Sequence, residues 1–266
     1  MLKYVLFDLD GTLTESGPGI KNGVRYALRS VGIVEEDEAV LDSFIGPSLV
    51  DSFSRVYGKT QEEGFHLQDV FREYYNVKGV YENEPYPGVL SLLKNLREKG
   101  CVLVLASSKP LDMATKVLTH FELQPYFDIV VCGEDHGPLF TKSGVIAEAI
   151  RRCAIHAFHS TTNENAATCN GQRTASDLVT KSLPSFSDMT VSQKELDEIK
   201  KNAVMVGDRI YDMEGAENNG ISAIGAGWGY APAGELESTK AICVCRDVAA
   251  LEQFLTEKEI CCCGCV

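Results

Sequence analysis

Basic residues are in short supply in this 266-residue chain. Its 25 Lys and Arg face 38 Asp and Glu, which gives a formal net charge of −13 at pH 7. Because nucleic acids and anionic membranes attract basic surfaces, this imbalance argues against either of them as the main partner. An anionic small molecule would need positive charge concentrated at its binding site.

Long apolar runs are missing as well. No stretch approaches the roughly 20 apolar residues of a membrane-spanning helix, and the N-terminus passes into a predicted strand without the layout of a signal peptide. These two absences favour a cytoplasmic protein. With 44% hydrophobic residues, the chain can bury a large core in one domain, or in one domain that carries a smaller insert.

Cysteine, in contrast, is abundant and falls into two groups. Six cysteines are scattered, and we interpret them as reduced thiols: Cys101, Cys132, Cys153, Cys169, Cys243 and Cys245. Four more stand close to the end: Cys261, Cys262, Cys263 and Cys265. Cys263 occupies the position that a prenyltransferase reads, and its neighbours would be available for palmitoylation. A membrane is therefore an expected partner only if these cysteines are lipidated, and the alternative is an unmodified, oxidation-prone tail.

Short apolar runs alternate with helical patterns over most of the chain. The expected strands are 3–7, 102–106, 129–132, 203–206, 222–225 and 241–244. The expected helices between them are 89–99, 111–121, 144–153 and 213–219. This alternation predicts an α/β fold with a Rossmann-like, mostly parallel sheet and helices on both faces. Ligands of such folds bind at the carboxyl ends of the strands.

Residues 16–85 interrupt the alternation with amphipathic stretches and no convincing strand. The expected helices there are 20–31, 36–44, 49–57 and 61–78. We expect an inserted, all-helical cap domain on a core made of residues 1–15 and 86–266. The joints of the insert are rich in Gly and Pro, so it is well placed to act as a lid over the strand ends.

A second interruption lies at about 155–200. Residues 159–192 are rich in Ser, Thr and Asn and lose all apolar periodicity. Such a composition cannot bury enough surface to form a layer of the core. We expect a disordered or loosely packed surface insert, followed by a short charged helix at 192–201.

Two carboxylates follow the first expected strand. The run Val5-Leu6-Phe7-Asp8-Leu9-Asp10-Gly11-Thr12 is a buried-strand pattern that ends in a glycine turn. A closely packed carboxylate pair repels itself unless a cation or a backbone rearrangement relieves it. Aspartate is also a competent nucleophile toward phosphoryl groups. Standing alone, however, the motif is equally well interpreted as a turn former.

Three further segments add hydroxyls, two lysines and two more acids. Ser107-Ser108-Lys109 follows the second expected core strand, Lys142 precedes a helix, and Gly207-Asp208-Arg209-Ile210-Tyr211-Asp212 follows another strand. Magnesium prefers oxygen ligands, which Asp8, Asp208 or Asp212 and the backbone carbonyl of Asp10 would provide. Taken singly, the serines are also typical helix caps, and Lys142 is a typical solvated charge.

In their order these four segments resemble the motifs of the haloacid dehalogenase (HAD) superfamily. The resemblance covers nearly the whole chain and is closest to the phosphoglycolate-phosphatase-like branch with a helical, type C1 cap. Further segments that look like that branch are 44–49, 71–75, 85–89 and 227–230. It implies a Mg²⁺-dependent phosphatase that hydrolyses small phosphomonoesters through an aspartyl-phosphate. An aspartate at position 10 favours phosphate chemistry over dehalogenation.

The resemblance also implies a role for each matching residue. Asp8 would be the nucleophile, Asp10 the general acid and base, and Ser107 and Lys142 the groups that hold the phosphate. The implied metal site is Asp8, Asp10, Asp208 and Asp212. The expected substrate-binding residues are Gly11, Thr12, Ser108 and Lys109 in the core, with Gly46 and Arg72 in the cap. For Arg72 the alternative is an ion pair with Glu62 or Glu73.

Other functions stay open at this point. A phosphomutase or a nucleotide or sugar phosphatase would use the same motifs. A non-catalytic, membrane-tethered binding protein on a HAD scaffold belongs to a different class, although such a protein has no need for Asp10. The expected partner is a small phosphorylated metabolite and not a nucleic acid, and the expected state is a monomer or homodimer.

Overall fold

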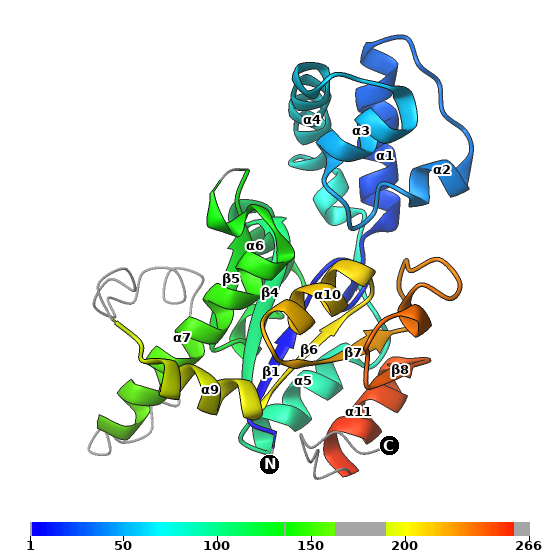
Figure 1. The fold of residues 1–266 in the computed structure, drawn as a ribbon. Helices are drawn as coiled ribbons and strands as arrows, with labels where there is room; N and C mark the ends of the chain where they lie inside the picture. Colours follow the sequence, from blue (N-terminus) through cyan, green and yellow to red (C-terminus); the bar gives the residue numbers. More distant parts are fainter. Residues whose placement is uncertain (1, 136, 163–189, 258–266) are drawn as a thin grey trace.

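The computed structural model describes residues 2–135, 137–162 and 190–257 (Figure 1). Its centre is a six-stranded, all-parallel sheet with the strand order β5-β4-β1-β6-β7-β8. The strands are β1 Tyr4–Phe7, β4 Val102–Pro110, β5 Ile129–Gly133, β6 Ala203–Gly207, β7 Ser222–Ala226 and β8 Cys243–Cys245. The predicted α/β class with a mostly parallel sheet is confirmed.

Helices cover both faces of this sheet because its strands are apolar on both sides. In β1, Val5 and Phe7 belong to one hydrophobic cluster, whereas Tyr4 and Leu6 belong to the other. The first cluster contains side chains of α5 (Val89–Glu98), α6 (Leu111–His120) and α11 (Val248–Glu257). The second contains side chains of α7 (Lys142–Thr162), α9 (Gln193–Lys201) and α10 (Ile210–Asn218).

Four helices between β1 and β4 gather beyond the carboxyl ends of the strands (Figure 1). They are α1 Gly17–Ser30, α2 Glu38–Asp42, α3 Leu49–Tyr57 and α4 Gln61–Tyr75, followed by the short η1 Gly79–Tyr81. Helix α4 begins with a capping box in which Thr60 and Glu63 satisfy each other's backbone amides. The chain enters and leaves this helical segment through a short antiparallel pair, β2 Thr14–Glu15 and β3 Glu84–Pro85.

Several element boundaries differ from the sequence-based expectations. Helix α7 continues to Thr162 instead of ending at 153, because the apolar spacing carries on through the buried Ile155. The first residues of the expected polar insert are therefore helical, whereas the charged helix at its end is present as α9. Strand β4 runs on to Pro110, and α11 was not expected although it repeats apolar residues at helical spacing. The rest of the insert lies outside the described residues.

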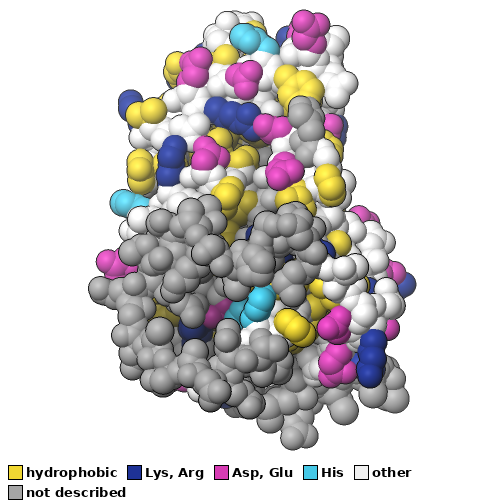
Figure 2. All heavy atoms as spheres, turned by 90° about the vertical axis from the view of Figure 1, so that its left-hand side faces the viewer, with side chains coloured by type: hydrophobic (Ala, Val, Ile, Leu, Met, Phe, Trp, Pro, Cys, Tyr) yellow, Lys and Arg dark blue, Asp and Glu magenta, His cyan; other side chains and the backbone are white. Residues whose placement is uncertain are grey.

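The described residues include free cysteines, and their charged side chains lie on the surface. Five cysteines there are free thiols: Cys101, Cys132, Cys153, Cys243 and Cys245. Cys169 and the four cysteines near the end lie outside the described residues. In the described part of the chain, every helix is too short or too polar to cross a bilayer. Figure 2 shows acidic and basic side chains interspersed over the helical segment at the top of the view.

Candidate active site

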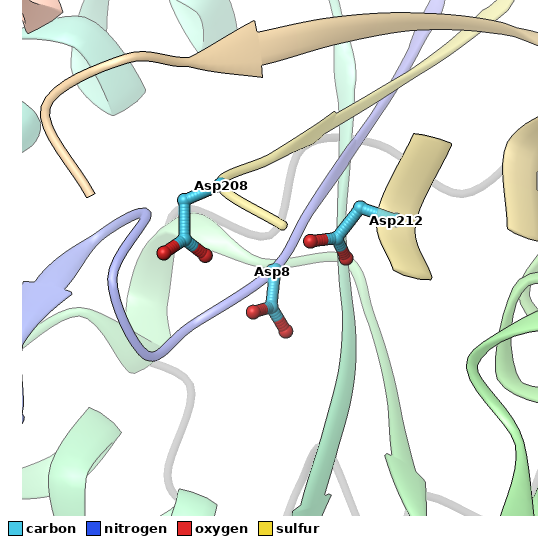
Figure 3. Close-up of side chains that lie close together, drawn as sticks. All are labelled: Asp8, Asp208 and Asp212. Atoms are coloured by element: carbon cyan, nitrogen blue, oxygen red, sulfur yellow. The ribbon is translucent and has the colours of Figure 1, made fainter. Parts of the chain in front are cut away.

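Three carboxylates meet at the carboxyl ends of β1 and β6. Asp8 follows β1, Asp208 follows β6, and Asp212 lies in the first turn of α10. Each offers an oxygen atom, and these atoms all lie within 4.8 Å of one another. Figure 3 shows the three side chains coming from separate segments toward a common space. The sheet register explains the meeting, since Phe7 pairs with Val206 and the amide of Asp8 donates to the Val206 carbonyl at 2.9 Å.

Lys142 supplies positive charge to two of these carboxylates. It is the first residue of α7, and its Nζ lies 2.6 Å from Oδ1 of Asp8 and 2.8 Å from Oδ1 of Asp212. The ammonium also donates to the Ala106 carbonyl at 3.0 Å. Burial alone would lower the pKa of Lys142, but Asp212 and Asp8 raise it above its ordinary value. The two carboxylates therefore favour the charged form of the lysine.

Asp208 is held by Gly11, Thr12 and Tyr230, of which the sequence analysis expected Gly11 and Thr12 on the substrate. The Thr12 hydroxyl lies 3.3 Å from Oδ1 of Asp208, and the Tyr230 amide donates to Oδ2 at 2.8 Å. Gly11 has φ +79°, and a Cβ there would lie 2.2 Å from Oδ2 of Asp208. The structure thus places Gly11 and Thr12 against the carboxylate, outside the set of residues that line the cavity described below.

Burial and the charges of neighbouring carboxylates disfavour ionisation of Asp8 and Asp208. Burial, in part offset by Lys142, raises the pKa of Asp8 to about 6. Burial and the charges of Asp212 and Asp8 raise the pKa of Asp208 well above its ordinary value. A cation held between them would relieve both effects.

The donor set fits a hard divalent cation. All three side chains offer carboxylate oxygens, the ligand type that Mg²⁺ prefers, and among the described residues Lys142 is the ammonium that pairs with them. The cluster is buried, yet Asp8 and Asp212 border the cavity described below, so a ligand in that cavity could reach an ion held there. Asp8, Asp208 and Asp212 are accordingly the residues that would bind Mg²⁺.

A cavity of about 580 Å³ opens beside the carboxylates, between the helical segment and the sheet. From the core, the expected site residues that line it are Asp8, Asp10, Ser107, Ser108, Lys109, Lys142 and Asp212. From the helical segment, Gly46 and Arg72 line it. Ser107 is buried and accepts a hydrogen bond from the Lys109 amide at 3.3 Å, whereas Ser108 is exposed. The structure therefore brings together residues that stand far apart in the sequence.

The two expected cap residues contact the core. Gly46 has φ +101°, and a Cβ there would lie 3.0 Å from the Arg209 side chain, whose guanidinium donates to the Ile45 carbonyl. Arg72 donates to Asp135 at 2.7 and 3.0 Å. Within the described residues its other ion pair is a longer one with Asp69, at 3.8 Å, so neither Glu62 nor Glu73 is its partner.

Three residues of the site were not singled out from the sequence. Arg209 stands inside the Gly-Asp motif and joins it to the helical segment, Tyr230 holds Asp208, and Tyr75 contacts Lys109. Tyr230 and Tyr75 fall in segments that carry the family resemblance. That position was the available signal, but it does not reveal which partner each side chain contacts.

Comparison with known proteins gives a consistent result. The model of the haloacid dehalogenase-like hydrolase family matches residues 5–165, and a second, HAD-hydrolase-like model matches residues 179–251. A "5'-nucleotidase" of Pseudomonas aeruginosa is 32% identical over 256 residues, which is 96% of each chain. A "phosphoglycolate phosphatase" of Aquifex aeolicus is 31% identical over 51% of this chain and 63% of its own. The crystal structure of a predicted phosphatase from Clostridium acetobutylicum superimposes with a TM-score of 0.74 at 32% identity, covering 97% of this chain and 100% of the other.

Proposed function

This chain belongs to the haloacid dehalogenase-like hydrolases, and we propose that it is a Mg²⁺-dependent phosphatase that hydrolyses small phosphomonoesters through an aspartyl-phosphate on Asp8. The observation that carries the proposal is the approach of Asp8, Asp208 and Asp212 around one space, with Lys142 beside them. Residues 16–85 would form the cap, and residues 1–15 and 86–266 the catalytic core.

The chain's own residues account for both steps of the reaction. In the first, Oδ of Asp8 attacks phosphorus, the bond to the ester oxygen breaks, and Asp10 gives its proton to the departing oxygen. In the second, Asp10 takes a proton from water, which attacks phosphorus and releases Asp8 and inorganic phosphate. Lys142 and the hydroxyl of Ser107 would hold the phosphate oxygens, where negative charge develops.

Magnesium, when bound, would offset the charge shared by the nucleophile and the phosphate. Asp8, Asp208 and Asp212 would hold it, together with the backbone carbonyl of Asp10. Four carboxylates, with Asp10 included, face the ammonium groups of Lys142 and Lys109, and the nearby guanidinium of Arg209 is paired with Glu235, so the site is short of positive charge without a cation.

The substrate is a small phosphomonoester whose class is set by the cavity. At about 580 Å³ the cavity falls in the range of pockets that hold drug-sized ligands, larger than a two-carbon phosphate ester needs. Phe140 and Tyr211 line it and are 51% and 39% exposed, so they offer aromatic faces for a base or a sugar ring. These features favour nucleoside monophosphates as a second candidate beside phosphoglycolate.

A phosphate-release assay tests this function. Purified protein is incubated with Mg²⁺ and a panel that contains 4-nitrophenyl phosphate, phosphoglycolate, sugar phosphates and nucleoside monophosphates. We expect release from 4-nitrophenyl phosphate and from at least one metabolite, and none above background from Asp8→Asn, which should remain folded because Asn keeps the shape of the side chain. Wild-type turnover by Asp8→Asn would remove Asp8 from the nucleophile role, and an inactive wild type would overturn the proposal.

A further inference from the structure

Tyr75 reaches from the helical segment to the strand ends of the α/β core. It is the last residue of α4, and its hydroxyl lies 2.7 Å from Nζ of Lys109 at the end of β4. The same Nζ lies 3.0 and 2.7 Å from the two carboxylate oxygens of Asp10. One ammonium thus bridges a phenol of the helical segment and the carboxylate to which we assign proton transfer.

The bridge uses the full donor capacity of the lysine. An ammonium has three N–H donors, and the three contacts to Asp10 and Tyr75 account for all of them. Because these donors rotate about a flexible stem, loss of the phenol oxygen would leave one donor free and let the ammonium turn away from Asp10. The position of Asp10 therefore depends on an atom that belongs to α4.

Packing fixes the phenol in place. Tyr75 is 1% exposed, its ring stacks on Phe71 with centroids 5.1 Å apart, and Lys109 Nζ lies 4.6 Å from the ring centroid. A Cβ at Gly79 would come within 2.7 Å of the ring, so the backbone after α4 also closes on it.

We propose that Tyr75 is a positioning residue for protonation of the leaving group, acting through Lys109 on Asp10. The inference rests on the proposed phosphatase function. As the bond between phosphorus and the ester oxygen breaks, its electron pair stays on that oxygen, which takes the proton of Asp10. Lys109 stabilises the carboxylate that forms on Asp10, and Tyr75 holds Lys109 in place for this. Proton donation is then complete only when α4 lies over the core.

The dependence on the leaving group separates this role from a structural one. A basic leaving group needs the proton during bond cleavage, whereas nitrophenolate leaves readily without it. A variant in which Asp10 is misplaced should therefore lose more kcat/KM on phenyl phosphate than on 4-nitrophenyl phosphate. A general loss of folding or of substrate binding would lower all members of the series equally. The ratio kcat/KM is the quantity to compare, because it excludes hydrolysis of the phosphoenzyme.

The experiment measures kcat/KM over this series for wild type, Tyr75→Phe, Lys109→Met and the double variant. The matched control is Tyr74→Phe, since Tyr74 is the preceding residue of α4 and its hydroxyl contacts Glu82 at 2.8 Å, away from Asp10. We expect Tyr75→Phe to lose about 10-fold on phenyl phosphate but less than about twofold on 4-nitrophenyl phosphate. Tyr74→Phe should match wild type on both, and Tyr75→Phe should add nothing to Lys109→Met.

Two results would overturn the inference while wild type remains active. One is an equal loss of Tyr75→Phe on every substrate of the series, and the other is a loss in the double variant that equals the product of the single losses. Should Lys109→Met fail to fold, the comparison of Tyr75→Phe with Tyr74→Phe decides by itself. Wild type that hydrolyses no member of the series would refute the proposed phosphatase function itself, and this inference with it.

Discussion

The two walls of the cavity are built in different ways. On the core side, Asp8 lines the cavity, and the sheet holds it beside Asp208 because both residues follow strands that pair in register. On the cap side, single side chains make the contacts: Lys109 reaches Tyr75, and Arg72 reaches Asp135. The carboxylates at the strand ends are therefore positioned by the sheet, whereas the contacts of Lys109 and Asp135 depend on how the helical segment lies.

The connections of the helical segment fit this division. The chain enters and leaves it through β2 and β3, whose only ladder within the described residues is the two-residue pair of Thr14 with Pro85 and Glu15 with Glu84. Short connections of this kind absorb rotation more easily than a continuous sheet does. Substitutions at the strand ends should therefore abolish phosphate release, and substitutions in the helical segment should lower kcat/KM by smaller factors.

The largest effect is expected from the metal ligands. Asp208→Asn should abolish Mg²⁺-dependent turnover and the rise in melting temperature that Mg²⁺ gives to wild type, which corresponds to about 2.7 kcal/mol at 100 times the Kd. The rise for wild type should be larger at pH 7.5 than at pH 5, because the pKa of Asp8 is raised to about 6 and a proton competes with the metal below that value. Thermal melts with and without Mg²⁺ at both pH values measure this.

The metal-free protein provides the control for the sign of this effect. A carboxyl whose folded-state pKa is raised contributes stability below its unfolded-state pKa and loses that contribution as the pH rises through the folded value. For Asp8 the window runs from the ordinary value of 3.8 to about 6. Its contribution to the free energy of unfolding should therefore fall across this window without metal, and Asp8→Asn should flatten the fall. Equal Mg²⁺ shifts at pH 5 and 7.5 would contradict the assignment.

Two glycines offer a matched test of the core and the helical segment. Alanine at Gly11 would place a Cβ 2.2 Å from Oδ2 of Asp208, whereas alanine at Gly46 would meet the flexible side chain of Arg209 at 3.0 Å. Both positions have positive φ, so both substitutions carry a backbone cost of about 1–2 kcal/mol. We expect kcat/KM to fall by about 100-fold for Gly11→Ala, because the carboxylate of Asp208 must move by about 1 Å. For Gly46→Ala we expect a fall of less than about 10-fold.

Melting temperatures make this comparison interpretable. Gly11→Ala should also lose more stability, because its Cβ meets a buried carboxylate and, at 2.8 Å, the Tyr230 ring, so both activities are measured at a temperature at which both variants are folded. If Gly46→Ala proved as inactive as Gly11→Ala under those conditions, the helical segment would have to be as strictly positioned as the strand ends.

The same division explains what could be predicted from the sequence. Strand patterns locate Asp8 and Asp208, because residues that follow paired parallel strands must lie side by side. The contacts of Tyr75 and Arg72 could not be predicted, because they depend on where α4 lies over the sheet, and no local pattern contains that information. Helix α7 was predicted too short because the polar residues after 158 concealed its continuation. For residues 163–189 the expectation of a polar surface insert stays a prediction.

The smallest effect is expected at the rim of the cavity. Arg72→Ala removes the ion pair that joins α4 to Asp135, in the loop after β5. Both side chains are partly exposed, so the pair is worth no more than about 1 kcal/mol, and kcat/KM should fall by about fivefold or less through a higher KM. Asp135→Asn should give a similar loss, and the double variant should lose no more than either single variant if the two residues act only on each other. Arg29→Ala, which removes an exposed pair with Glu36 on the helical segment, is the control and should match wild type. A loss of 100-fold or more for Arg72→Ala, with Asp135→Asn unaffected, would instead mean that Arg72 binds the substrate directly, and this wall of the cavity would then take part in binding as strictly as the strand ends do.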